Sequence, residues 1–262
     1  MAERRPRRAT SHETDTRRVG LARALSKLGY CSRSRASELV RAGRVRLNGA
    51  AQRNPEAPVR VGADRIEVDC RSVGAEAKIY LVLNKPRGLV TTASDEKGRE
   101  TVYSCLKPGL PFLSPVGRLD KASEGLLLLT NDTEWAARIA APESHLDKTY
   151  HVQINAVADV ALVATVVKGV RAAEGYVLRA KSVEILRRGE QNSWLVVILD
   201  EGRNRQIRRM FDALGIKVLR LVRVAIGPLG LGELPKRACR ELTAQEKSLL
   251  DAALQHPTRI AG

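Results

Sequence analysis

The first regular pattern of apolar residues begins at Val19 and has helical spacing. It predicts one helix that ends at Gly29 and a second that Ser32 caps and that runs to Gly43. The apolar positions that define the two helices are Leu21, Leu25, Leu28, Ala36, Leu39 and Val40. The spacing therefore predicts a pair of short helices at the front of the chain.

Alternation of apolar and basic residues follows the second helix. In RVRLNGA (44–50), Arg44 and Arg46 alternate with two inward residues, and Asn48–Gly49 is a strong hairpin signal. Two helices followed by a hairpin and further short strands, at 58–61 and 65–69, predict a small front domain.

The rest of the chain mixes strands and helices without strict alternation, which favours an α+β domain with a mixed or mostly antiparallel sheet. A helix is expected after Asn131-Asp132, ending before Pro142. Strands are expected at 79–85, 125–130, 149–154 and 193–200. We expect a disordered basic arm over 1–17, a front domain over 18–71, a linker over 72–77, a main domain over 78–250 and a tail over 251–262.

The segment 200–215, DEGRNRQIRRMFDALG, predicts a turn at Gly202 and a helix from about Arg205. Its core stripe is Ile207, Met210, Phe211 and Leu214, and its other face carries Arg205, Arg208, Arg209 and Asp212. Guanidinium groups at a positive helix N-terminus repel the helix dipole, so an anion is expected there. Phosphate and a buried carboxylate are the two candidates.

Charge and cysteine usage narrow the class of protein. The formal net charge is +16, which favours a polyanionic partner such as nucleic acid over an acidic membrane surface. No apolar run approaches the roughly 18–20 residues of a membrane helix. The four cysteines and four histidines do not cluster, so we expect reduced thiols in the cytoplasm and no metal site.

A carboxylate stands at the edge of a very apolar segment in GRLDKASEGLLLLTND (117–132). Asp120 lies between Arg118 and Lys121, just before four consecutive leucines. The residues alone leave two interpretations open. Asp120 is either part of a solvated ion pair in a loop or a nucleophile or base at the floor of a cleft.

Two resemblances decide between these interpretations. Residues of about 17–70, with SRSRA (32–36) and GRVRLNG (43–49), resemble the S4 RNA-binding domain. The order of VGRLDKASEGLLLLTND, DKTYHV and EGRNRQIRRMF, with LNKPRG before and RVAIGPLGLGEL after, resembles pseudouridine synthases of the RsuA family. The expected fold is thus α+β, with a small S4-like domain and a mostly antiparallel synthase domain with flanking helices.

The family resemblance implies a role for several residues. Asp120 would be the catalytic aspartate, Tyr150 the aromatic residue that packs on the target base, and Arg208 the ionic partner of Asp120. Ile207 would line the pocket, and Arg118 would contact RNA near the vacated base position. Further RNA contacts are expected from Arg205, Arg209, Arg33, Arg35, Arg44 and Arg46.

The implied reaction is the isomerisation of a uridine in RNA, which requires no cofactor. We expect a monomer that acts on ribosomal RNA, either free or in an assembly intermediate, and most resembles the branch that modifies large-subunit (23S) RNA. Small-subunit (16S) RNA is the alternative substrate, and a tRNA is a weaker one. A non-catalytic S4-type RNA-binding or ribosome-assembly protein is the competing class, and a DNA-binding regulator is a third.

Overall fold

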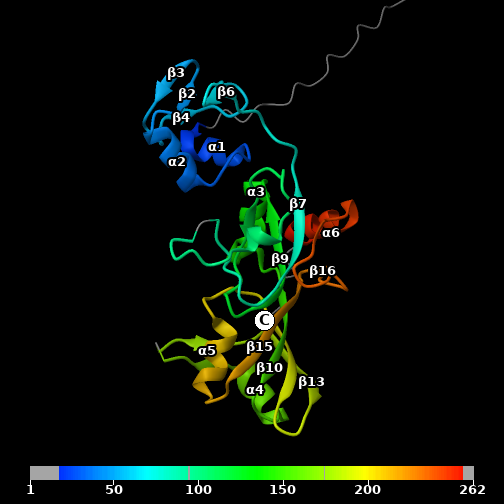
Figure 1. Ribbon diagram of the computed structural model, residues 1–262. Coiled ribbons are helices and arrows are strands. Elements are labelled where there is room, and N and C mark those ends of the chain that lie inside the picture. Colours follow the sequence, from blue (N-terminus) through cyan, green and yellow to red (C-terminus); the bar gives the residue numbers. More distant parts are fainter. Residues whose placement is uncertain (1–17, 94, 174, 256–262) are drawn as a thin grey trace, which may run out of the picture. The chain divides into compact units, whose positions relative to one another are not determined.

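A computed structural model describes residues 18–93, 95–173 and 175–255, so the arm expected over 1–17 lies outside the described residues. The chain divides between Glu76 and Ala77 into two compact units (Figure 1). Each unit contains helices and strands, which confirms the α+β class.

The front unit contains the expected helix pair and hairpin. Ser32 caps the second helix, because its hydroxyl accepts a hydrogen bond from the backbone N–H of Arg35. Asn48 and Gly49 both have positive φ, of 51° and 85°, as a two-residue hairpin turn requires. The elements are β1 Val19–Gly20, α1 Leu21–Lys27, α2 Arg33–Arg41, β2 Val45–Leu47, β3 Ala50–Gln52, β4 Pro58–Val59, β5 Ile66–Val68 and β6 Arg71–Ser72.

The rear unit is built on one large sheet. Its helices are α3 Thr133–Ala140, α4 Val160–Lys168, α5 Gln206–Ala213 and α6 Ala244–Gln255, with 3-10 turns at Val102–Cys105 and Pro142–Ser144. Its strands are β7 Tyr80–Lys85, β8 Ser114–Val116, β9 Glu124–Thr130, β10 Lys148–Ile154, β11 Val170–Arg171, β12 Val177–Leu178, β13 Ser182–Arg188, β14 Ser193–Leu199, β15 Val218–Ile226, β16 Leu229–Gly230 and β17 Cys239–Glu241.

The strand order of this sheet is β13-β14-β10-β15-β9-β7-β17, with β16 beside β15 and β8 beside β9. Only the β15–β9 pair is parallel among the described strand pairs of the sheet, so the expected mixed and mostly antiparallel sheet is confirmed. The parallel contact is short and joins Val222 to Glu124 and Arg223 to Gly125. It brings the loop before β9 next to β10 and β15, where the site lies.

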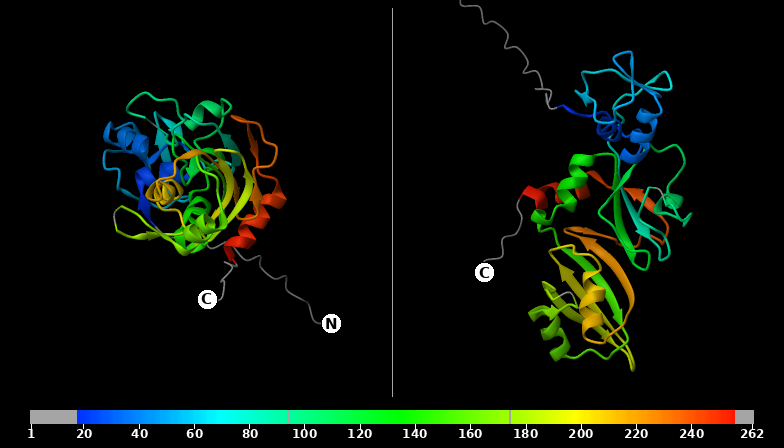
Figure 2. Two further views of the ribbon diagram at one scale, coloured as in Figure 1. Left: turned by 90° about the horizontal axis from the view of Figure 1, so that it is seen from below. Right: turned by 90° about the vertical axis from the view of Figure 1, so that its left-hand side faces the viewer.

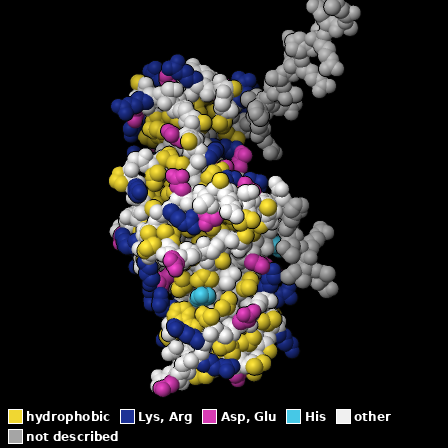
Figure 3. Space-filling model, turned by 90° about the vertical axis from the view of Figure 1, so that its right-hand side faces the viewer, with side chains coloured by type: hydrophobic (Ala, Val, Ile, Leu, Met, Phe, Trp, Pro, Cys, Tyr) yellow, Lys and Arg dark blue, Asp and Glu magenta, His cyan; other side chains and the backbone are white. Residues whose placement is uncertain are grey.

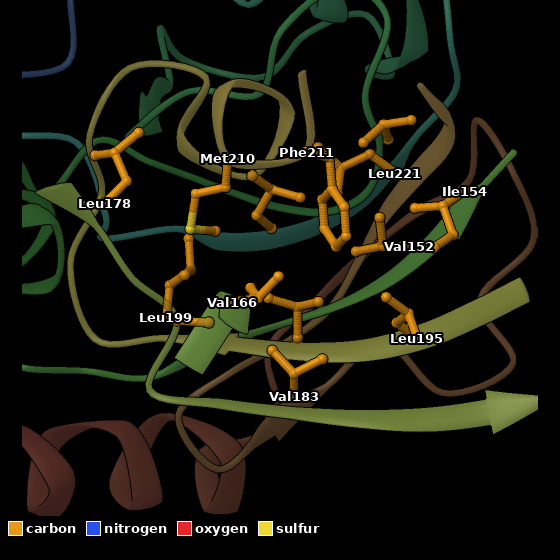
Figure 4. Close-up of a cluster of buried hydrophobic side chains, with 14 of the residues drawn as sticks. Val152, Ile154, Val166, Leu178, Val183, Leu195, Leu199, Met210, Phe211 and Leu221 are labelled. Atoms are coloured by element: carbon orange, nitrogen blue, oxygen red, sulfur yellow. The ribbon is translucent and has the colours of Figure 1, made fainter. Parts of the chain in front are cut away.

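Helices α4 and α5 pack on one face of strands β10, β13, β14 and β15. Met210 and Phe211 point from α5 toward the strand side chains, including Val152 and Leu195 (Figure 4). Both residues belong to the apolar stripe expected from the sequence, and both are fully buried. The packing fixes the start of α5 relative to the sheet.

Helix α6 lies beside α3, as Figure 2 shows in red and green. Leu250 is buried against this part of the core, and the indole N–H of Trp135 donates a 2.7 Å hydrogen bond to Asp251. The tail expected from residue 251 is therefore corrected, because α6 continues to Gln255. Asp132 caps α3 by accepting from the backbone N–H of Trp135, as its position in the sequence predicted.

Candidate active site

A cavity of about 620 Å³ lies in the rear unit, beside the parallel β9–β15 contact. Its wall is formed by the turn before β9, by β10 and β15, and by the loop that leads into α5. Asp120, Tyr150, Ile207, Arg118 and Arg205 all line it. The structure thus brings together five of the residues that the sequence singled out.

The turn that carries Asp120 is held at five successive backbone carbonyls. Side chains supply four of the donors: Thr91 Oγ1 to Leu119 O (2.7 Å), Lys85 Nζ to Asp120 O (3.1 Å) and to Ser123 O (2.9 Å), and Arg208 Nη2 to Ala122 O (3.1 Å). Backbone N–H groups supply the other two: Ser123 N to Asp120 O (2.9 Å) and Gly88 N to Lys121 O (2.8 Å). A segment with every carbonyl engaged has few alternative conformations, so the Asp120 side chain is presented from a fixed backbone.

Lys85 is the main support of this turn, and the sequence reading missed it. It is 0% exposed, and its ammonium donates to the carbonyls of Pro86, Asp120 and Ser123. Burial lowers the pKa of Lys85 to about 8, although the nearby carboxylates of Asp120 and Glu124 partly oppose this. A lysine that ends an apolar strand and precedes proline was the available sequence signal.

The Asp120 carboxylate faces the cavity and retains 36% side-chain exposure. Among the described residues, the cation that pairs with it is the Arg205 guanidinium, whose Nη1 lies 3.8 Å from Asp120 Oδ2. Arg205 was expected inside the helix but precedes it, as the N-cap residue with a left-handed φ of 49°. Buried Gln206 holds this loop through Glu201 Oε1 at 2.6 Å and the Arg179 carbonyl at 3.0 Å.

Arg208, expected as the ionic partner of Asp120, has a different set of contacts. Its Nη1 donates to Val218 O at 3.0 Å and its Nη2 to Ala122 O. Burial, together with repulsion from Arg205, lowers the pKa of the guanidinium, and the Asp120 charge opposes this. The expected direct pair is thus corrected: within the described chain, Arg205 pairs with Asp120, whereas Arg208 supports the turn and acts on Asp120 only at longer range.

Tyr150 is half-buried on β10, and Ile207 is buried in the first turn of α5. Arg118 is exposed on the outer wall of the cavity. Arg209 does not line the cavity, because its guanidinium lies over the ring of Tyr176, 4.8 Å from the centroid. Arg209 therefore belongs to the rim beside the β11–β12 hairpin rather than to the pocket.

The front-unit arginines expected to face RNA are all exposed, but two have acidic partners. Arg35 pairs with Glu38 at 2.9 Å, and Arg44 donates to Asp69 through Nε at 2.8 Å. The guanidinium groups of these two residues are therefore already paired with carboxylates. Arg33 and Arg46 have no acidic partner within the described part of the chain.

Basic side chains are widely distributed on the molecular surface. Figure 3 shows Lys and Arg over much of the face that it draws, with acidic side chains between them. Within the described residues, no group of three or more His, Cys, Asp or Glu could hold a metal ion, and no helix has the length and apolar character needed to cross a membrane. The four cysteines are free thiols.

Comparison with known proteins identifies the class to which this fold and cavity belong. The RNA pseudouridylate synthase family model matches residues 79–213, and the S4 domain model matches residues 19–64. The chain belongs to the RNA pseudouridylate synthase family and carries an S4 domain, which confirms both resemblances. Its activity is accordingly that of a pseudouridine synthase acting on RNA.

Individual relatives cover nearly the whole chain. Ribosomal large subunit pseudouridine synthase B of Bacillus subtilis (strain 168) is 38% identical, over 90% of this chain and 97% of that one. An uncharacterized RNA pseudouridine synthase of Aquifex aeolicus (strain VF5) is 35% identical, over 90% and 95%. A crystal structure of a pseudouridylate synthase superposes with a TM-score of 0.63 at 31% identity, over 88% of this chain and 99% of that one.

Proposed function

We propose that this protein converts a specific uridine of ribosomal RNA to pseudouridine, with Asp120 as the catalytic aspartate. The observation that carries the proposal is the position of the Asp120 carboxylate. It lines a cavity together with Tyr150, and its backbone is fixed by Lys85 and Arg208. A carboxylate in a merely solvated loop would not need the buried ammonium of Lys85 and the half-buried guanidinium of Arg208 to hold the adjacent carbonyls.

In the proposed reaction, the uridine leaves its stacked position in the RNA and enters the cavity. Its base packs on Tyr150, with Ile207 beside it, while Arg118 contacts the RNA near the vacated position. Asp120 acts as nucleophile or proton acceptor, with Arg205 beside its charge. The bond from C1′ to N1 breaks, the uracil turns, and C1′ bonds to C5. The C5 proton leaves and N1 gains one, so no oxidant or reductant is required.

Large-subunit RNA is the substrate that we propose, in the free RNA or in an assembly intermediate. The name of the Bacillus subtilis relative, which spans nearly the same length, supports this choice. Small-subunit RNA is the alternative. The front unit would hold RNA through Arg33 and Arg46, whose charges have no acidic partner in the described chain. We place the reaction in the cytoplasm, in keeping with the free thiols.

Mapping the product tests the substrate assignment. Transcripts of 23S and 16S RNA are incubated with the protein, and pseudouridines are located by carbodiimide adducts that stop reverse transcription. We expect one new stop in the 23S transcript and none in the 16S transcript. A stop in 16S RNA alone would overturn the large-subunit assignment. Tight binding to both RNAs without any stop, also in partly assembled particles, would favour the non-catalytic RNA-binding protein.

A further inference from the structure

Two basic residues of the cavity wall have no role in the chemistry described so far. Arg223 lies on β15 and is only 5% exposed. Its Nε donates a 2.8 Å hydrogen bond to the Leu126 carbonyl, but its Nη2 is buried and has no hydrogen-bond partner. Strand pairing places Arg223 directly beside Tyr150, and both line the cavity. Arg223 therefore keeps one unused donor, on the β9 side of a residue that lines the cavity beside Tyr150.

Lys148 is the second of these residues. It lies two positions before Tyr150 on β10, on the same face of the strand, and it lines the same cavity. The neighbouring carboxylate of Asp147 bonds to Lys181 at 2.7 Å instead. Burial and the charge of Arg223 lower the pKa of Lys148, while the carboxylates of Asp147 and Asp200 partly oppose this. Within the described residues, no acid forms a salt bridge with either Lys148 or Arg223.

Two like charges in one cavity wall repel each other, and an unsatisfied buried donor adds a further cost. A neutral carbonyl group could satisfy the donor but could not offset the repulsion. A bound anion removes both costs at once. RNA brings one anion per nucleotide, in the phosphodiester group, and a uridine that enters this cavity brings its own phosphates with it.

We propose that Lys148 and Arg223 form a phosphate subsite that holds a phosphodiester group of the target uridine. The inference rests on the proposed function, because it places the base of the same nucleotide on Tyr150. With the phosphate bound on one side and Asp120 on the other, the ribose is fixed between them. The sugar then stays in place while the uracil detaches and turns.

Binding of small ligands tests the subsite without any need for turnover. Uridine, uridine 3′-monophosphate and uridine 5′-monophosphate are titrated into the full-length protein, with ligand-observed NMR to detect weak binding. We expect one monophosphate to bind about 10- to 100-fold more tightly than uridine, as a charge-assisted contact provides. Whether the 3′ or the 5′ form is preferred identifies which phosphodiester group occupies the subsite.

The variants are Lys148→Met and Arg223→Gln. Lys181→Met is the control, because Lys181 lies just before β13 and pairs with Asp147 but does not line the cavity. Each must melt at the temperature of the native protein before it is compared. Lys148→Met makes the test independent of Arg223, whose loss also frees the Leu126 carbonyl. We call the tighter binding of the monophosphate relative to uridine the phosphate advantage. We expect both cavity variants to lose this phosphate advantage while they bind uridine as the native protein does. The control should keep it.

Two results would overturn the subsite. One is the same affinity of the native protein for uridine and for both monophosphates. The other is a loss of uridine affinity as large as the loss of monophosphate affinity, which would mean that these residues contact the base. Turnover of ribosomal RNA is measured on the same samples. Turnover without a phosphate advantage refutes the subsite alone, and a phosphate advantage without turnover refutes the proposed function alone.

Discussion

Replacing Lys85 with methionine removes the ammonium that holds the Asp120 turn while nearly keeping the side-chain volume. The carbonyls of Pro86 and Ser123 lose this donor, whereas Asp120 O keeps the hydrogen bond from Ser123 N–H. A buried carbonyl without its donor costs about 1–3 kcal/mol, so two cost roughly 2–6 kcal/mol. Part of this is recovered because a charge no longer has to be buried, and we expect a net destabilisation of about 1–3 kcal/mol.

Lys85→Met should also slow catalysis in the molecules that remain folded. A displacement of about 1 Å at a reacting group lowers the rate by roughly 100-fold, and the turn has only Arg208 and neutral donors left to hold it. The assay is single-turnover tritium release from RNA labelled at uridine C5, alongside urea unfolding. Lys121→Met is the matched control, because Lys121 is an exposed lysine of the same turn. A Lys85→Met protein with native kcat would refute the positioning role.

The pH dependence of the native protein provides a second measurement on Lys85. The pKa of about 8 means that the ammonium loses a proton above pH 8, and the neutral amine has two N–H groups for three carbonyls. We therefore expect kcat to fall above about pH 8. Because this pKa is below its unfolded value of 10.5, the contribution of Lys85 to the free energy of unfolding rises from pH 8 to 10.5 and is lost as the pH falls through 8. A kcat that stays constant to pH 10 would contradict this account.

The remaining predictions concern the sheet contact, the base platform and the ion pair. Gly125→Ala should lower the free energy of unfolding by at least about 3 kcal/mol more than Gly88→Ala does. Both glycines have φ near +100°, but only at Gly125 would an added Cβ lie 2.2 Å from Arg223 O. Equal unfolding free energies of the two variants would refute this. Tyr150→Leu should lower kcat/KM by about 10- to 100-fold, because the aromatic ring packs on the base, and Tyr150→Phe should lower it by much less. If both variants lose the same amount of tritium-release activity, the ring does not act by packing. Arg205→Gln should change the unfolding free energy by less than about 1 kcal/mol, because the pair is half-exposed, but should lower kcat; an unchanged kcat would remove Arg205 from the site.

Local features of the fold could be predicted because they depend on neighbouring residues. Ser32 and Asp132 cap their helices as expected, and the Asn48–Gly49 turn has the expected backbone conformation. Core positions such as Met210 and Phe211 follow from helical spacing alone. Each of these inferences requires only a few consecutive residues.

Features that depend on distant residues could not be predicted in the same way. The parallel contact of Arg223 with Gly125 joins segments that are far apart in the sequence. Lys85 reaches the Asp120 turn because β7 pairs with β9, which places Lys85 opposite Gly125. The left-handed backbone at Arg205 turns that residue, rather than Arg208, toward Asp120. The pairing of Arg44 with Asp69 likewise depends on how β2 and β5 are aligned.

The most direct test of the central claim compares the native protein with Asp120→Asn in tritium release from C5-labelled 23S RNA. The substitution keeps the size of the side chain and leaves the backbone hydrogen bonds of the turn available, so RNA binding should be retained. We expect release by the native protein and none by the variant at equal RNA affinity. Release by the Asp120→Asn protein at the native rate would contradict it.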